Sequence, residues 1–402
     1  MIELNSKTPK KQLDSYLAQT VQELMNCNRC ILVTGAGISC SAGIPDFRSS
    51  DGLYNLVKEK FPTTFTRGSD LFDATLFKST EATTYFYKFM GELKDSIQQS
   101  SHTLTHQFIK LLGDKGKLLR CYTQNIDDLE NDLNLNTNLN DIGVQVVQMH
   151  GTLSRVVCTL SNQHNFEFDD KHIECFKEGK IPNCPSCETY EQERVKSGKR
   201  APATGLLRPD IVLYNETHPQ GEQIGSIQCN DLRKKPDLLI IMGTSLKVVG
   251  CKRLVKEMAK SIHANKKGKV IFVNLGTVSD SEWGDVIDYH FQLPTDDWVK
   301  KIMNVWGQLD RNTPKNLLMG RKSIAMSASK SSKRATLARS KSSLSSKRQV
   351  RINVAKAIKS KPKSPKLVQS PLKFPSVKKN TDNVLKKTPA FKEFNSKLSN
   401  IY

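Results

Sequence analysis

The stretch Gly35-Ala-Gly37-Ile-Ser39-Cys-Ser41-Ala-Gly43-Ile-Pro45-Asp46-Phe47-Arg48 follows the apolar run Cys30-Ile-Leu-Val-Thr34 without a gap. The run is typical of a buried strand, and the glycines after it predict a tight turn. Glycines let a backbone approach a pyrophosphate, and a helix that starts after the turn offers free N–H groups to an anion. Two glycines alone are as typical of an ordinary strand-to-helix turn, with Ser39 or Ser41 as the helix cap.

Further apolar runs along the chain have the length and composition of buried strands. They are separated by stretches in which apolar residues recur with helical spacing, such as 81–99, 102–112 and 250–264, and another such stretch, 11–27, precedes the first run. Strands that alternate with helices predict an α/β fold with a Rossmann-like parallel sheet. The later strands are predicted at 118–123, 144–149, 237–242 and 269–274.

Two segments break this alternation. One has four cysteines and little periodicity, which predicts a small inserted zinc-binding module. The other is rich in Ser, Lys, Pro and Asn, and such a composition buries too little apolar surface to offset chain entropy, which predicts disorder. We therefore predict a partly helical N-terminal extension (1–24, loose over 1–10), a catalytic domain (25–154 and 205–310), the zinc-binding module (155–204) and a disordered basic C-terminal tail (311–402).

The net charge of +21 is concentrated in the predicted tail. Residues 311–402 contain 24 Lys and Arg but only 2 acidic residues, so 37 basic and 38 acidic residues remain in 1–310. The predicted folded part is therefore nearly neutral. No run of 18 apolar residues and no apolar signal core is present, so we expect no membrane association, and the ten cysteines are expected to be reduced or metal-bound.

Five segments together resemble the sirtuin family, in the order that the family has. They are the loop 35–48, Thr123-Gln-Asn-Ile-Asp127, His150-Gly151, Gly243-Thr-Ser-Leu246 and Val273-Asn274. The string Gly43-Ile-Pro-Asp-Phe-Arg48 differs from the third-glycine pattern of a dehydrogenase. The resemblance covers about residues 20–305 and implies a protein deacylase that consumes NAD⁺ as a co-substrate.

The resemblance also implies a role for residues in these segments. His150 matches the catalytic histidine, a base that helps a ribose hydroxyl react once nicotinamide has left. A lone histidine is more often structural, but this one follows the predicted strand 144–149 at the edge where ligands bind. Asn125 and Asp127 are expected to hold the nicotinamide carboxamide and to act with His150. The full set expected to bind NAD⁺ is Gly35, Ala36, Gly37, Ile38, Asp46, Phe47, Arg48, Gln124, Asn125, Ile126, Asp127, Gly243, Thr244, Ser245 and Asn274.

An acetyl-lysine peptide is the substrate that the resemblance implies, giving nicotinamide, O-acetyl-ADP-ribose and free lysine. Family enzymes pair this peptide with two strands through backbone hydrogen bonds. One of those strands matches Val212, Leu213, Tyr214, Asn215 and Glu216, where the family usually has an aromatic residue and a glycine. Family members that remove acidic acyl groups carry Tyr-x-x-Arg. This chain has Tyr85 and Lys88, which favours acetyl.

The cysteine module contains Cys184-Pro-Ser-Cys187, whose spacing lets two thiolates bind one tetrahedral Zn²⁺. In the family a first cysteine pair precedes this one, but here Cys158 is followed three residues later by Ser161. Cys175 is then expected to be the fourth ligand. The predicted structural zinc site is Cys158, Cys175, Cys184 and Cys187, while Cys27 and Cys30 are expected to be buried thiols.

The tail and the segment 207–219 predict partners. The segment is most similar to a fungal branch of nuclear sirtuins that act on histones, which implies acetylated histones as targets and a nuclear location. Lys333-Arg334 and Lys347-Arg348-Gln-Val-Arg351 resemble a two-part signal for a nuclear import receptor. The tail charge predicts non-specific contact with DNA. Ser364 and Ser370 each precede proline, so a proline-directed kinase could modify them.

Three other functions are compatible with parts of the sequence. A dehydrogenase fits the strand–glycine–helix start but leaves the cysteine module unexplained. A sirtuin-like mono-ADP-ribosyltransferase would share the whole motif set. Its activity would appear as transfer of labelled ADP-ribose from NAD⁺ to protein. A non-catalytic chromatin-binding protein would rely on the tail, but the presence of His150, Asn125 and Asp127 argues against this function.

Overall fold

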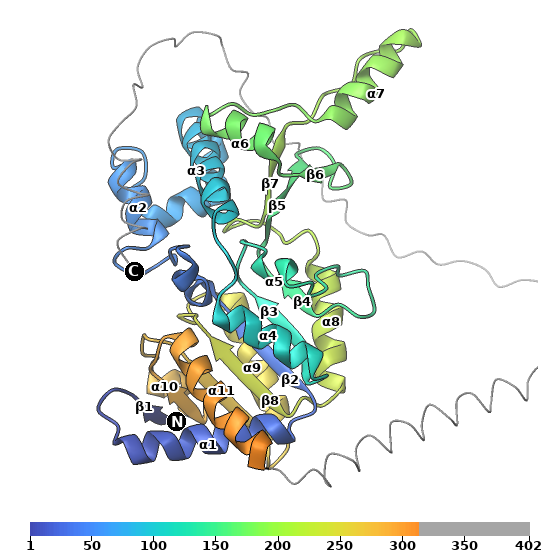
Figure 1. Cartoon of the computed structure of the whole chain (residues 1–402). Helices are drawn as coiled ribbons and strands as arrows, with labels where there is room; N and C mark the ends of the chain where they lie inside the picture. Colours follow the sequence, from blue (N-terminus) through green and yellow to red (C-terminus); the bar gives the residue numbers. More distant parts are fainter. Residues whose placement is uncertain (313–402) are drawn as a thin grey trace, which may run out of the picture. The chain divides into compact units, whose positions relative to one another are not determined.

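The computed structural model describes residues 1–312 of the chain (Figure 1). Met1–Met303 belong to one compact unit, and the described part of a second unit is the end of a helix from Asn304 onward. The tail features predicted between 313 and 402 lie outside the described residues. Within the described part of the chain, no helix has the length and hydropathy needed to cross a bilayer.

A seven-stranded parallel sheet forms the centre of the compact unit, which confirms the predicted Rossmann-like α/β fold. Its strands lie in the order β1-β10-β9-β8-β2-β3-β4. Every residue of β2 and of β8 is buried, because helices cover both faces of a parallel sheet. The strands are β1 (Ile2–Leu4), β2 (Cys30–Thr34), β3 (Leu118–Thr123), β4 (Val146–Gln148), β8 (Leu238–Met242), β9 (Lys269–Val273) and β10 (Tyr289–Phe291).

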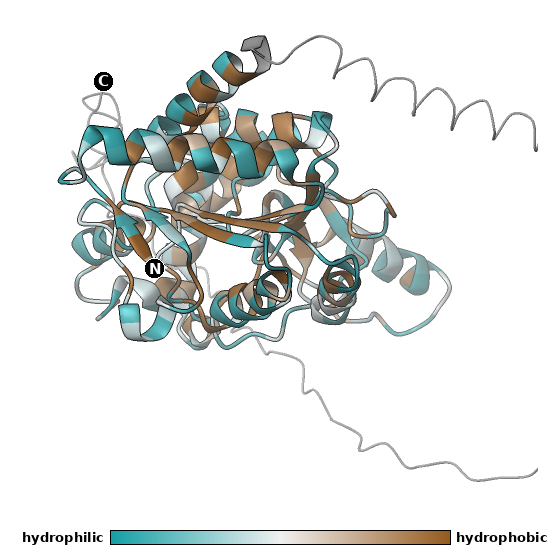
Figure 2. Ribbon diagram, turned by 90° about the horizontal axis from the view of Figure 1, so that it is seen from below, coloured by the Kyte–Doolittle hydropathy of each residue, from teal (hydrophilic) through white to brown (hydrophobic). Residues whose placement is uncertain are grey.

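Two layers of helices enclose this sheet, and their apolar sides face the strands (Figure 2). Alternate residues of β2, Ile31 and Val33, share one core cluster with the buried side of α9. On α4 the ring of Phe108 lies 5.8 Å from that of Trp298 on α11, and Trp298 also contacts Phe291 of β10. The helices that accompany the sheet are α1 (Lys10–Asn26), α4 (Leu104–Asp114), α5 (Leu129–Asp132), α8 (Gly221–Arg233), α9 (Val249–His263), α10 (Asp280–Trp283) and α11 (Thr295–Asn312).

The first residues of the chain are part of the sheet, so the expectation that residues 1–10 are loose was wrong. Ile2 to Leu4 pair in parallel with Tyr289 to Phe291. The terminal ammonium of Met1 donates to the carbonyl of Gly284 at 2.9 Å. A strand of three residues is too short to show a periodic pattern, and β10 supplies the partner from nearly 290 residues away along the chain.

Within the compact unit Met1–Met303, a second, antiparallel sheet has the strand order β6-β5-β7. This sheet and the helices packed on it are called the smaller unit below. The predicted zinc-binding module (155–204) contributes β6, α6, α7 and part of β5, whereas β7 follows it and much of the core comes from segments that precede β3. Phe176 of α6 packs against Tyr87 of α3 with ring centroids 4.7 Å apart. Helix α7 extends away from the other elements (Figure 1). The elements are α2 (Leu53–Lys60), 3₁₀ turns η3 (Gly68–Phe72) and η4 (Ala74–Lys78), α3 (Thr80–Gln98), β5 (Gly151–Cys158), β6 (Asn165–Glu167), α6 (Asp170–Lys177), α7 (Pro185–Lys196) and β7 (Leu207–Ile211).

A buried ion pair connects β3 to α8. Arg120 donates from Nε and Nη2 to the two carboxylate oxygens of Asp231, at 2.8 and 2.9 Å. The hydroxyl of Tyr122 donates to the same carboxylate at 2.8 Å. The Asp231 side chain has no exposed surface and that of Arg120 is 6% exposed. Removing one partner from such a pair leaves the other charge buried without compensation.

We predict that Asp231→Ala lowers the free energy of unfolding by about 3–5 kcal/mol, since Arg120 would remain charged in an apolar environment. The measurement is urea unfolding of the full chain. As a control, Asp114→Ala removes an exposed partner of Lys110 within α4 and should change stability little. Equal free energies of unfolding for the two variants would show that the Arg120–Asp231 pair does not stabilise the fold.

Candidate active site and metal centre

Two glycine-containing loops meet at the carboxyl ends of β2 and β8. The N–H of Gly37 donates to the carbonyl of Gly243 at 2.9 Å. A Cβ atom on Gly37 would lie 2.8 Å from the Cα of Gly243, and one on Gly243 would lie 2.6 Å from the nitrogen of Ile38. Gly243 also has a φ of +61°, which favours glycine. The two loop backbones therefore touch, and no residue larger than glycine fits at position 37 or at position 243.

The loop after β2 forms two short 3₁₀ turns, η1 (Ala36–Ile38) and η2 (Cys40–Ala42), instead of the regular helix expected there. Neither turn has a side-chain cap, so the prediction that Ser39 or Ser41 caps a helix was wrong. The hydroxyl of Ser41 donates to Asp296 at 2.7 Å. Ser39 is fully buried and its hydroxyl donates to Asp127 at 2.7 Å.

Ser39 thus joins Asn125 and Asp127 in a buried polar cluster at the end of β3. The side-chain amide of Asn125 donates to Ser39 Oγ at 3.0 Å and to Asp127 Oδ2 at 3.3 Å. Its carbonyl oxygen Oδ1 is buried and has no hydrogen-bond partner. Burial raises the pKa of Asp127 to about 6 although the hydrogen bond from Ser39 opposes this shift. The cluster offers one carboxylate and one unpaired amide oxygen.

His150 follows β4, which pairs with β3, so it lies at the same edge of the sheet as the end of β3. Its Nδ1 is 3.0 Å from the carbonyl oxygen of Gln124, which can only accept, so Nδ1 carries the proton. Nε2 then has a free lone pair. Burial lowers the pKa of His150, so the ring stays neutral near pH 7. Gly151 follows with a φ of +77°, and a Cβ atom there would lie 2.1 Å from the carbonyl of Asp210, which explains the His-Gly pair.

Gln124 connects the ends of three strands. Its side-chain amide donates to the carbonyl of Thr34 at 3.2 Å and to the hydroxyl of Thr244 at 2.9 Å. Beyond β9, the side chain of Asn274 donates to the carbonyl of Gly276 at 3.1 Å. Ser245 is exposed, whereas Ile126 is buried in the core of the smaller unit. The carboxyl ends of β9, β8, β2 and β3, which are neighbours in the parallel sheet, form one continuous edge, as the sequence predicted.

The loop of Asp46, Phe47 and Arg48 lies against aromatic side chains of the smaller unit. Asp46 accepts hydrogen bonds from the N–H groups of residues 48 and 49, which fixes the turn. The ring of Phe47 lies 5.3 Å from that of Phe72. Arg48 lies over the ring of Tyr54 and donates to the hydroxyl of Tyr214 at 3.3 Å. Arg48 thus contacts a residue of the predicted peptide-binding segment.

That segment, Val212 to Glu216, is a bridge and a turn after β7 rather than the predicted strand. Tyr214 forms a parallel bridge opposite Asp73: its N–H donates to the carbonyl of Phe72 at 2.8 Å, and its carbonyl accepts from the N–H of Ala74 at 3.0 Å. The N–H of Leu213 donates to the side chain of Glu216 at 2.9 Å, and its carbonyl accepts from the Glu216 N–H. Asn215 has a φ of +63°, so this position suits glycine or asparagine. The backbone conformation explains why Asn replaces Gly here.

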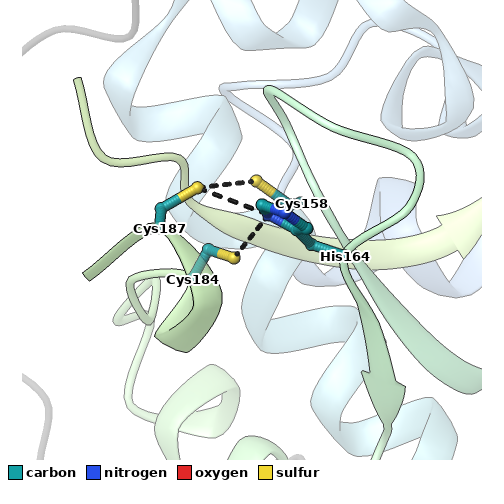
Figure 3. A group of neighbouring side chains, drawn as sticks. All are labelled: Cys158, His164, Cys184 and Cys187. Carbon is teal, nitrogen blue, oxygen red and sulfur yellow. Dashed lines mark hydrogen bonds between the residues drawn. The ribbon is translucent and has the colours of Figure 1, made fainter. Parts of the chain in front are cut away.

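Four side chains of the smaller unit form a group that fits a zinc ion (Figure 3). Cys158 Sγ and Cys187 Sγ are 3.7 Å apart, and His164 Nδ1 is 3.5 Å from the sulfur of Cys184 and from that of Cys187. Tetrahedral bonds of ordinary length to Zn²⁺ place two sulfurs about 3.8 Å apart and a sulfur and a nitrogen about 3.6 Å apart. The group therefore matches a closed, structural Cys₃His site.

The fourth member of this group is His164, so the prediction of Cys175 as the fourth ligand was wrong. Cys175 lies on α6, and its thiol points to the carbonyl of Lys180, 3.7 Å away. His164 lies in the loop that joins β5 and β6, and this short hairpin returns it beside Cys158. Its spacing of six residues from Cys158 is a signal in the sequence, but the predicted ligand set was drawn from cysteines alone.

We predict that His164→Ala loses the bound zinc and melts at a lower temperature, because structural metal binding is coupled to folding. Cys175→Ser should keep about one zinc per chain, and His164→Cys should restore binding with a fourth thiolate. Metal analysis by mass spectrometry, with a thermal melt of each variant, measures both effects. Zinc loss in Cys175→Ser together with zinc retention in His164→Ala would reverse the assignment.

The comparisons with known proteins agree with this geometry. The Sir2 family model matches residues 35–250. An NAD-dependent histone deacetylase HST3 of Candida albicans is 45% identical over 300 residues, which are 71% of this chain and 61% of that protein. An HST3 of Saccharomyces cerevisiae is 42% identical over 301 residues, covering 71% of this chain and 67% of that protein. The match thus spans less than two thirds of the Candida relative.

Solved structures show the same fold. A Sir2 mutant with a p53 peptide and NAD has a TM-score of 0.53 and 23% identity, covering 72% of this chain and 98% of that one. Another Sir2 enzyme structure has a TM-score of 0.54 and 23% identity, covering 74% and 99%. The family model spans more than half of the chain and includes the glycine loop, the 123–127 segment and His150. The chain therefore belongs to the Sir2 family, the sirtuins.

Proposed function

We propose that this protein removes acetyl groups from lysine side chains in an NAD⁺-dependent reaction, with histones as substrates. The observation that carries the proposal is the tautomer of His150: Nδ1 donates to the carbonyl of Gln124, which leaves Nε2 with a free lone pair. A neutral imidazole in this state can accept a proton from a hydroxyl group near pH 7.

The buried cluster fits the nicotinamide end of NAD⁺. Asn125 Oδ1 is a buried acceptor without a partner, and a carboxamide N–H supplies the donor that it lacks. Asp127 accepts from Ser39, so its carboxylate is held in place before any ligand arrives. The glycine loop after β2, where Gly37 touches Gly243, would lie against the pyrophosphate, since glycine turns that follow a parallel strand bind such groups. Bound NAD⁺ would supply the ribose carbon that accepts the acetyl oxygen.

The chain's own residues then have separate roles in the proposed reaction. His150 would take a proton from a ribose hydroxyl at Nε2, and Gln124 would keep the ring in the required orientation. Phe47, packed on Phe72, would exclude water from the ribose. Arg48 would approach phosphate or ribose oxygens after leaving Tyr214. The expected products are nicotinamide, O-acetyl-ADP-ribose and free lysine.

Histones are proposed as substrates because both HST3 relatives are named histone deacetylases. The acetyl-lysine peptide would bind along Val212 to Glu216, where Arg48 and Tyr214 bring the cofactor loop and this segment together. Histone substrates imply action in the nucleus. The basic clusters at 333–351 and the Ser-Pro sites at 364 and 370 support a role for the tail in nuclear import, contact with DNA and regulation by a kinase.

We predict that His150→Asn lowers kcat/KM for an acetyl-histone peptide by a factor of about 100–10,000, since the base is lost while an amide N–H can still donate to Gln124. His172→Asn is the matched control, because His172 lies on α6 and pairs with Asp169. The assay follows nicotinamide release and loss of the acetyl mass. A His150→Asn protein with a native melt and near-normal turnover would exclude His150 as the base.

The pH dependence of the wild type provides a further test of this role. Because burial lowers the pKa of His150, the ring remains unprotonated at pH values where an ordinary histidine is charged. Activity lost through protonation of His150 should therefore fall only below the ordinary histidine pKa of about 6.5. The readout is the profile of kcat/KM against pH for the acetyl-peptide. An acidic limb well above pH 6.5 would contradict a buried neutral base.

We predict that catalysis depends on the folded part of the chain, and that nuclear accumulation and DNA binding depend on the tail. A variant that ends at Leu309 should keep NAD⁺-dependent activity on a short acetyl-peptide and lose nuclear accumulation and salt-sensitive binding to DNA. Peptide assays, fluorescence microscopy of tagged chains and DNA titrations at several salt concentrations measure these outcomes. Loss of peptide activity on truncation would show that the tail is needed for catalysis.

A further inference from the structure

The glycine loop after β2 is bound from outside by side-chain hydrogen bonds to two other elements. The hydroxyl of Thr103, at the start of α4, donates to the carbonyl of Ile38 at 2.9 Å. The hydroxyl of Ser41 donates to Asp296 Oδ2 at 2.7 Å, and Asp296 lies 255 residues later along the chain, in the first turn of α11. The two bonded positions lie on either side of Ser39, which belongs to the buried polar cluster at the end of β3.

The carboxylate of Asp296 accepts three hydrogen bonds from two separate elements. Its Oδ1 accepts from the N–H and from the hydroxyl of Thr105, at 2.9 and 2.6 Å, while its Oδ2 accepts from Ser41. The Thr105 N–H is in the first turn of α4, where N–H groups have no partner within the helix. Asp296 therefore joins three parts of the chain, which are the glycine loop, α4 and α11.

The position of Asp296 is set by the core beneath it. Trp298, two residues later on α11, has no exposed surface. Its ring lies 5.8 Å from that of Phe108 on α4 and 6.0 Å from that of Phe291 on β10, so α4 and α11 are neighbours (Figure 1). Because protein interiors are close-packed, the backbone of α11 has little freedom to follow a displaced loop. The carboxylate is thus a fixed acceptor for the hydroxyl of Ser41.

Ser41 itself is exposed, so water could satisfy its hydroxyl equally well. Its bond to Asp296 is therefore not needed to solvate the hydroxyl, and its main consequence is the placement of the loop. Two residues later the chain turns at Gly43, whose φ is +86°, and continues into residues 46–48, which rest on the smaller unit. The bond thus fixes the loop between the buried cluster and this second half.

We propose that Asp296 is a positioning residue for NAD⁺ binding, and that it acts through Ser41 on the glycine loop. With the bond formed, Ser39 is aligned with Asp127 and Asn125 before NAD⁺ arrives. Without it, the turn that carries Ser41 is free to move toward solvent, and part of the binding energy is then used to order the loop. This inference rests on the proposed function, which places NAD⁺ against this loop.

Ser41→Ala separates this role from the contact of Asp296 with α4. The variant removes one exposed oxygen atom and leaves both bonds from Thr105 in place, so its melting temperature should stay close to that of the wild type. We expect NAD⁺ to bind about fivefold more weakly, which is the effect of one ordinary hydrogen bond. The KM for NAD⁺ should rise by a similar factor, while kcat and the KM for the acetyl-peptide stay unchanged.

Asp296 is tested with two variants of different chemistry. Asp296→Ala removes every acceptor and should weaken NAD⁺ binding about fivefold or more, with a lower melting temperature because α4 also loses a partner. Asp296→Asn keeps an oxygen for the Thr105 N–H and presents an N–H group that the Ser41 oxygen can accept, so it should restore most of the affinity. Asp297→Ala is the matched control, since Asp297 is exposed in the same turn and lies 3.8 Å from Lys300 within α11.

A double variant tests whether the two residues act through each other. If they do, Ser41→Ala combined with Asp296→Ala should bind NAD⁺ no more weakly than Asp296→Ala alone, because the bond between them is already lost. Affinities for NAD⁺ are measured by calorimetry with the full chain in the absence of peptide. Steady-state assays with saturating acetyl-peptide give kcat and the KM for NAD⁺, and each variant is also melted.

Three results would overturn the proposal. Wild-type affinity in Ser41→Ala together with a defect in Asp296→Ala would show that Asp296 only stabilises α4. Multiplied defects in the double variant would show that the two residues act independently. A fall in kcat with unchanged affinity for NAD⁺ would place the effect on the chemical step. Calorimetry requires no turnover, so a wild type that binds NAD⁺ without deacetylating would contradict the proposed function while these comparisons still decide the role of Asp296.

Discussion

The backbone contact between Gly37 and Gly243 is the constraint on which the rest of the site depends. Any side chain at either position would collide with the opposite loop. The contact lets β2 and β8 pair up to their carboxyl ends, and β3 pairs with β2 on the other side, so Gln124 reaches both Thr34 and Thr244. The position of Gln124 in turn sets the carbonyl that orients His150. The close packing of the strand ends thus places the carbonyl that fixes the tautomer of the proposed base.

A second feature of the site is the depth at which its polar groups lie. Ser39, Asn125 and Asp127 are almost completely buried, and each has at least one partner from the same cluster. Burial makes an unpaired donor or acceptor costly, so the amide oxygen of Asn125 favours a ligand that can donate to it. The same burial raises the pKa of Asp127 to about 6. Stability and ligand preference therefore have one physical origin.

The smaller unit supports the site from the other side. Arg48 and Phe47 contact Tyr214 and Phe72, which belong to this unit, so the cofactor loop rests on it. The zinc-like group holds β5 to the start of α7, and a Cβ atom on Gly205 would lie 2.3 Å from Cys158 Sγ, so the chain before β7 passes tightly over this group. β7 leads into the segment whose Val212 N–H donates to the carbonyl of His150.

The sequence by itself determined the features that depend on local patterns. Apolar runs and helical spacing located the central strands and the helices α1, α4 and α9 of the sheet layers, because backbone preferences act within a few residues. The glycine loop, the 123–127 segment and His150 identified the family. Tertiary structure alone decided which distant side chains meet. Ser39 reaches Asp127 across 88 residues, His164 replaces Cys175 because a hairpin returns it to Cys158, and β1 pairs with β10. The local pattern around Ser39 and around β1 encodes neither contact, since each exists only once the parallel sheet has formed.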